Sequence, residues 1–251
     1  MELEFKNLAN ISDYNFRYIK RKTNYFLKYV LEDVDYSEFL TKVEIVSDYN
    51  EGLKFYFLTG KGGYDYNDKK IVLTDIKNRN ELDLCIHHEV LHLQFAINNQ
   101  FKFNNYVEFV GYNFLNEFNS VYGSYMYNLI LNPNDEYSIN GIKNEISMYE
   151  KIYRLLKKGL RDFQDNIGDR KLEECQQQLV DEHKNNYIIT NNYLLARSIA
   201  CVYINLKLIN IWNIGNEFID NIILYIKEKI NLKDITLNNC EEIGKMVLGL
   251  A

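Results

Sequence analysis

The chain has 251 residues, of which 47% are hydrophobic and 25% charged, a balance typical of a globular protein with one large domain or two small ones. This composition excludes a disordered chain, a collagen-like chain and a small disulfide scaffold. The net charge of −6 argues against a broad nucleic-acid-binding surface, so we expect no direct nucleic-acid partner.

The cysteines and the apolar segments indicate a cytoplasmic protein. The 4 cysteines are far apart and form no C-x-x-C pair, which is typical of a reducing compartment rather than of a disulfide framework. Residues 1–6 lack the basic-then-apolar order of a signal peptide. The most apolar stretch, residues 193–214, is interrupted by Arg197 and Lys207, which favours a buried helix over a membrane span.

The spacing of hydrophobic residues changes within the first third of the chain. Over residues 12–40 the spacing of aromatic and aliphatic residues predicts one or two helices, capped by Ser12 or Asp13. Residues 53–58 and 70–74 are short, apolar and rich in aromatic or β-branched side chains, so we predict two strands there. The glycine-rich residues 60–63 are expected to form the turn after the first strand.

The rest of the chain is expected to be helical. A core helix begins near Asn80, which is suited to cap it, because the apolar residues that follow fall on all sides. A second helix spans about Tyr106–Leu131 and ends before Pro133, and further helices follow from residue 140.

The expected fold class is therefore α+β, mostly helical, with a small antiparallel sheet. We divide the chain into a core with N-terminal helices over residues 1–135 and a helical region over residues 136–251 that packs on this core.

A possible metal site lies inside the apolar helix. His88 and His92 are four residues apart, so one helical turn points both imidazoles the same way. Glu89 follows His88 and is placed to act on a water held by a metal at those nitrogens. This is the H-E-x-x-H pattern of zinc peptidases, with two imidazole ligands and one carboxylate base. We therefore predict Zn²⁺ as the cofactor.

The third ligand is expected on the next helix. Glu108 and Glu117 are nine residues apart, which is half a turn in phase, so we expect that only one of them faces the core. Glu117 lies closer to the apolar stripe and is the predicted ligand, with Asn113 and Ser124 as neighbours that could hydrogen-bond it.

Two other histidines are weaker candidates for a role in the metal site. His87 points about a third of a turn away from His88 and is expected to pack or to support the ligands. His183 remains open as a third ligand or as a group that stabilises an oxyanion, although an exposed position at a helix end fits it better.

These residues resemble a known group of enzymes. His88-Glu89-Val90-Leu91-His92, followed by Glu117 in an Asn-Glu segment, is similar to the gluzincins, the H-E-x-x-H peptidases with a glutamate as third ligand. The size, the short sheet before the helix and the apolar residues before Pro133 resemble the ImmA/IrrE metallopeptidases. The resemblance covers about residues 53–133 and implies a zincin-like core. Asn119, Ser120, Val121 and Tyr122 replace the alanine-rich pattern that usually follows the family's glutamate.

The sequence therefore predicts an intracellular zinc metallopeptidase that hydrolyses a peptide bond. His88, His92 and Glu117 are the expected zinc ligands, and Glu89 is the expected general base. The strand over residues 70–74 is the candidate edge strand for pairing with an extended protein or peptide substrate. The family resemblance suggests a transcriptional repressor as the substrate. Two alternatives stay open: a non-proteolytic, zinc-containing binding or toxin-like module, and a different zinc hydrolase.

Overall fold

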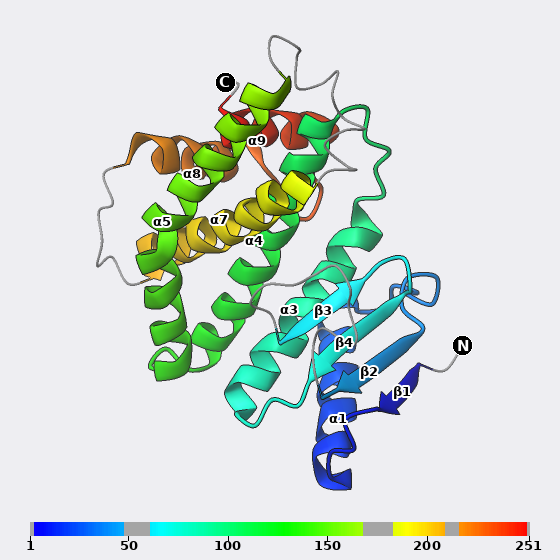
Figure 1. Cartoon of the computed structure of the whole chain (residues 1–251). Helices are drawn as coiled ribbons and strands as arrows, with labels where there is room; N and C mark the ends of the chain where they lie inside the picture. The colour runs from blue at the N-terminus through cyan, green and yellow to red at the C-terminus, as the bar shows by residue number, and fades with distance from the viewer. Residues whose placement is uncertain (1–2, 48–60, 168–182, 209–215, 250–251) are drawn as a thin grey trace. The chain divides into compact units, whose positions relative to one another are not determined.

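The structure is a computed structural model that describes residues 3–47, 61–167, 183–208 and 216–249 (Figure 1). The chain divides into two compact units. The first contains Met1–Asn98 and Gly123–Tyr137, and the second contains Asn99–Tyr122 and Ser138–Ala251. The second unit thus includes residues 99–122, which the sequence-based division assigns to the first region. The strand predicted over residues 53–58 lies outside the described residues.

The first unit contains a small mixed sheet with the strand order β1-β2-β4-β3. The strands are β1 (Glu4–Asn7), β2 (Lys42–Val46), β3 (Gly62–Asp65) and β4 (Lys70–Thr74). Among the described strands, only β3 and β4 pair antiparallel, whereas β1 pairs parallel with β2 and β2 pairs parallel with β4. The prediction of an antiparallel sheet is therefore wrong. The reason is that helix α1 (Asp13–Leu31) connects β1 to β2, and a helical crossover brings the chain back in the same direction.

Two expectations about these strands need correction. The predicted strand over Lys70–Thr74 is present as β4, but it lies between β2 and β3 and is not an edge strand. Within the described residues, the strand at the edge next to it is β3, which contains Gly62 and Gly63 of the predicted turn. The hairpin turn instead falls between β3 and β4, where Asp65 Oδ1 accepts hydrogen bonds from the backbone of Asn67 and Asp68.

Side chains alternate along β2 and β4, so that one face is apolar and the other mixes charged residues with the buried Val46 and Val72. Val43, Ile45, Ile71 and Leu73 belong to one apolar cluster with residues of α1 and of α3 (Arg79–Asn98), and both helices lie along this face in Figure 1. The sheet thus forms the base on which α3 is held.

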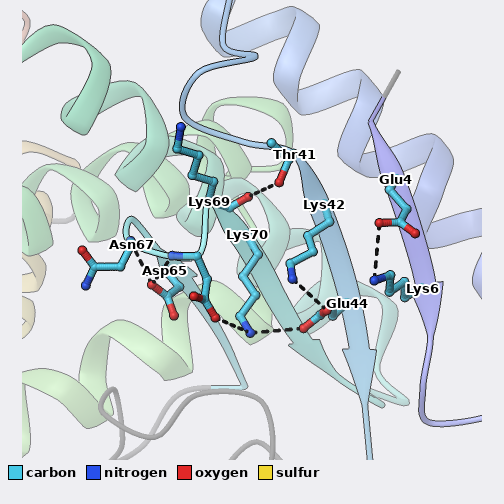
Figure 2. Close-up of polar contacts among 10 residues, drawn as sticks. Glu4, Lys6, Thr41, Lys42, Glu44, Asp65, Asn67, Lys69 and Lys70 are labelled. Atoms are coloured by element: carbon cyan, nitrogen blue, oxygen red, sulfur yellow. Dashed lines mark hydrogen bonds and ion pairs between the residues drawn. The ribbon is translucent and has the colours of Figure 1, made fainter. Parts of the chain in front are cut away.

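The other face of the sheet carries ion pairs instead. In Figure 2, Lys70 reaches Glu44 on the neighbouring strand, at 3.3 Å, and Lys42 also approaches Glu44, at 3.5 Å. Lys6 pairs with Glu4 on β1 at 3.4 Å. Lys70 is nevertheless buried, and its ammonium group is compensated by Glu44 and by Asp68, which lies 3.1 Å away.

The N-terminal ends of α1 and α3 show which caps are used. Ser12 caps α1 as predicted, since its hydroxyl accepts a hydrogen bond from Asn15 N. Helix α3 is capped by Asn78 rather than by Asn80, because Asn78 Oδ1 accepts from the backbone of Asn80 and Glu81. The cap therefore lies two residues before the predicted one, and Asn80 is already inside the helix.

The described part of the second unit is helical, and each of its helices carries buried residues (Figure 1). Helix α4 (Tyr106–Leu131) has the bounds expected from the sequence. It is followed by α5 (Glu136–Ile167), α7 (His183–Leu208), α8 (Glu217–Lys229) and α9 (Leu237–Leu248). In the described part of the chain, no helix combines the length and the apolar character that crossing a membrane requires.

Candidate metal site

Helix α3 places two imidazoles side by side. His88 and His92 are one turn apart, their Nε2 atoms lie 3.0 Å from each other, and their rings are nearly perpendicular at 89°. Two nitrogens bound to one tetrahedral zinc at about 2.0–2.1 Å would lie about 3.3 Å apart. The observed separation is close to that value, so both nitrogens could share one ion.

Glu117 completes a group of three candidate ligands. One ligand atom from each of His88, His92 and Glu117 lies within 4.8 Å of the other two. Glu117 is 2% exposed and lies on α4, which continues without a break through Tyr122 into the residues of the first unit. The structure therefore brings together the three residues that the sequence predicts. His183 begins α7, and its side chain lies outside the described part of the structure.

Glu108, the competing candidate, has a different role. Asn104 donates to its carboxylate from the backbone N–H at 2.6 Å and from the side-chain amide at 3.1 Å. Glu108 N in turn donates to Asn105 Oδ1 at 2.9 Å. The carboxylate thus belongs to the cap of α4. The expectation that only one of the two glutamates is buried is wrong, since Glu108 is 5% exposed. It is buried because α9 packs on the other side of α4 near Gly111.

The environment of Glu117 is charged on one side. Arg197 Nη1 of α7 donates to Glu117 Oε1 at 3.0 Å. The same guanidinium donates from Nε and Nη2 to Glu145 Oε1 of α5, at 3.0 and 2.8 Å. Asn113, which was expected to support Glu117, instead donates to the carbonyl of Phe109 in its own helix. Arg197 therefore connects the third candidate ligand to a second carboxylate.

Glu89 lies beside the start of β3. It is buried, and its Oε1 would lie 3.2 Å from a Cβ atom added at Gly62. The same added atom would lie 2.5 Å from Cys85 Sγ. Only glycine leaves the space next to Glu89 open at this position. The structure thus places the Glu89 carboxylate beside strand β3.

His87 packs among aromatic rings. Its ring stacks on Phe26 with the centroids 4.6 Å apart and meets Tyr127 edge-on at 4.7 Å. Burial, with a smaller contribution from the neighbouring His88, lowers the pKa of His87 to about 3, so its imidazole stays neutral. This packing position agrees with the role expected from the sequence.

Sequence reasoning missed Arg197 and Glu145. A signal for Arg197 was present, because a charged residue inside an apolar helix needs a buried partner. The partner could not be named from the sequence, since Glu117 and Glu145 lie 80 and 52 residues away.

Two imidazoles and one carboxylate form a donor set that suits zinc and leaves a fourth tetrahedral position for water. Comparison of the chain with protein-family models, with curated proteins and with solved structures gave no match. The case for a metal site therefore rests on its own geometry: His88, His92 and Glu117 form a group that could hold a metal ion.

Proposed function

We propose that this protein is a zinc-dependent metallopeptidase that hydrolyses a peptide bond in a protein substrate in the cytoplasm. The observation that carries the proposal is the convergence of His88, His92 and Glu117 within 4.8 Å, with Glu89 next to His88 on the same helix. A structural zinc site needs four protein ligands, whereas a hydrolytic site uses three and keeps one position for water.

Each residue has a distinct task in this proposal. His88, His92 and Glu117 hold the ion, which when bound would lower the pKa of a coordinated water and polarise the scissile carbonyl. Glu89 accepts a proton from the attacking water and later delivers it to the leaving amine. Its burial supports this role, because a carboxylate shielded from bulk water keeps the transferred proton within the site.

The substrate would lie along β3 rather than along β4. In the described residues β3 is paired on one side, with β4, so its other side is the candidate edge for an extended peptide. Gly62 at the start of β3 is next to Glu89, which would bring the peptide backbone close to the base. A protein substrate, of which a transcriptional repressor is the example suggested by the family resemblance, would enter with an extended segment.

The test combines metal content with cleavage. The full chain is loaded with zinc, analysed for bound metal and incubated with a pool of synthetic peptides whose products are read by mass spectrometry. We expect one zinc per chain and cleavage of some peptides. Glu89→Gln keeps the size of the side chain but cannot accept the proton, so it should retain zinc while turnover falls by about 10²-fold or more.

Glu81→Gln is the matched control, since Glu81 lies in the first turn of the same helix and pairs with Lys61. This variant should retain both zinc and turnover. No bound zinc in the wild-type protein would refute the proposal. Bound zinc with no cleavage by any preparation would favour the non-proteolytic zinc module, and full turnover by Glu89→Gln would refute the role of Glu89.

A further inference from the structure

The role of the helices after residue 135 can be inferred from one side chain. Arg197 is in the interior of α7, where its guanidinium uses three N–H groups on two carboxylates. Its side chain is 25% exposed, while those of Glu117 and Glu145 are 2% and 18% exposed. Hydrogen bonds between charged groups in such places are short and directional, so they fix the orientation of both partners.

The Arg197 side chain is itself held in place. Ser198, the next residue of α7, donates from Oγ to the backbone carbonyl of Glu145 at 3.0 Å. On the preceding turn of α7, the Asn192 amide donates to the backbone carbonyl of Val110 in α4, also at 3.0 Å. These bonds tie α7 to α5 and to α4 on either side of Arg197, so the guanidinium approaches Glu117 from a fixed direction.

The charges of Arg197, Glu117 and Glu145 determine how Arg197 affects a cation bound near Glu117. Arg197 and Glu145 together have no net charge, so the pair adds little repulsion toward a cation near Glu117. The guanidinium nevertheless forms an ion pair with the buried Glu117 carboxylate, and a buried charge without such a partner is costly.

We propose that Arg197, held by Glu145, is a positioning residue that presents Glu117 to the metal as an oriented ligand. The proposal rests on the proposed function, since it assumes that Glu117 is a ligand. It assigns to α5 and α7 the task of completing the metal site. Supporting groups behind metal ligands typically contribute 10–100-fold to metal affinity.

The experiment separates orientation from charge with a charge-conserving double variant. Arg197→Gln with Glu145→Gln removes the three hydrogen bonds of the guanidinium but leaves the net charge of the group unchanged. The matched control is Glu150→Gln with Arg154→Gln, the same exchange at an exposed ion pair of α5 in which the two side chains are 76% and 80% exposed. Zinc affinity is measured by competition with a chromophoric chelator, and the visible absorption spectrum of the Co²⁺-loaded protein reports ligand geometry.

We expect the double variant to bind zinc 10–100-fold more weakly, with an altered Co²⁺ spectrum, and the control to match the wild type. Wild-type affinity and an unchanged spectrum in the double variant would overturn the proposal. If the double variant fails to fold, Arg197→Lys tests the proposal instead. Lysine keeps the positive charge, but its single ammonium group cannot reproduce the planar guanidinium that hydrogen-bonds both carboxylates. Weaker zinc binding by Arg197→Lys with wild-type helix content supports the proposal, and wild-type affinity overturns it.

The result also distinguishes this inference from the proposed function. A wild-type protein that binds neither zinc nor Co²⁺ refutes both. A wild-type protein that binds zinc, together with a double variant that binds it equally well, refutes only the role of Arg197.

Discussion

Glu108 and Glu117 show how two buried carboxylates on one helix acquire different functions. Both lie on α4 and both are less than a tenth exposed, but Glu108 accepts hydrogen bonds from Asn104 whereas Glu117 faces the two imidazoles of α3 and Arg197. Burial alone therefore does not identify a ligand. What distinguishes Glu117 is the kind of neighbour. A carboxylate that caps a helix accepts hydrogen bonds from nearby N–H groups, whereas a metal ligand lies near other atoms that can bind the same metal ion.

Substitution by alanine should separate these roles. Glu117→Ala removes a ligand atom, so zinc affinity should fall by more than the 10–100-fold typical of a supporting residue. Glu108→Ala should leave zinc affinity within about twofold of the wild type but lower the free energy of unfolding by about 2–3 kcal/mol, since two hydrogen bonds to a buried charge are lost.

Chelator competition and urea unfolding would measure the two quantities on the same preparations. The assignment of Glu117 as the third ligand fails if Glu108→Ala loses zinc and Glu117→Ala keeps it.

At the scale of elements, the crossing of α4 and α9 depends on two glycines. A Cβ atom added at Gly111 would lie 1.8 Å from the carbonyl oxygen of Cys240, and one added at Gly244 would lie 2.1 Å from that of Val107. Backbone therefore meets backbone at this crossing. The close approach fixes the N-terminal half of α4, the half that carries Glu108 and leads to Glu117.

Gly111→Ala should destabilise the protein, because backbone atoms of α9 cannot move aside as a side chain can. Overpacking costs about 1–3 kcal/mol, and a Cβ only 1.8 Å from a backbone oxygen belongs at the upper end of that range, above the gain of about 1 kcal/mol from replacing glycine by alanine inside a helix. Gly123→Ala on the same helix is the control, since its Cβ would meet only the end of the Leu91 side chain, at 2.8 Å. Thermal unfolding of both variants tests this, and an equal change in melting temperature for the two would contradict it.

Elements with a strong local signal were predictable from the sequence, and those set by distant residues were not. Helix α4 and strand β4 have the predicted bounds, because hydrophobic spacing and the proline after α4 are local. The position of β4 inside the sheet depends on its pairing with β2, which comes 28 residues earlier in the chain (Lys42 pairs with Lys70), as well as with β3. The Gly111–α9 crossing joins segments more than 100 residues apart, and a glycine in a helix does not reveal its partner.

The candidate site follows the same rule. His88, Glu89 and His92 are recognisable because one helical turn fixes their geometry. Glu117 was reached by helical phase, and the structure brings it to the two imidazoles although the premise about Glu108 was wrong. The roles of Arg197 and Glu145 could not be predicted from the sequence, because their contact depends on how α5 and α7 pack.

At the scale of the whole molecule, α4 takes part in both compact units. Its residues up to Tyr122 belong to the second unit with α5, α7, α8 and α9, and its residues from Gly123 belong to the first. In the second unit Phe118 of α4 contacts Tyr203 of α7, with the ring centroids 5.9 Å apart. The N-terminal half of α4 therefore depends for its burial on helices that come much later in the chain.

A chain truncated after Pro133 should consequently fail as a metal-binding protein. It keeps His88, His92 and Glu117 but loses Arg197, and it exposes the apolar residues of α4 that α7 and α9 cover, which favours aggregation. The measurements are the soluble yield and the zinc content of the truncated chain against the full chain. Co-expression of residues 134–251 as a separate chain is the control: if the loss comes from the missing partner surface, the second chain should restore both solubility and zinc. A truncated chain that is soluble, monomeric and binds one zinc as tightly as the full chain would show that the later helices are not needed to build the site.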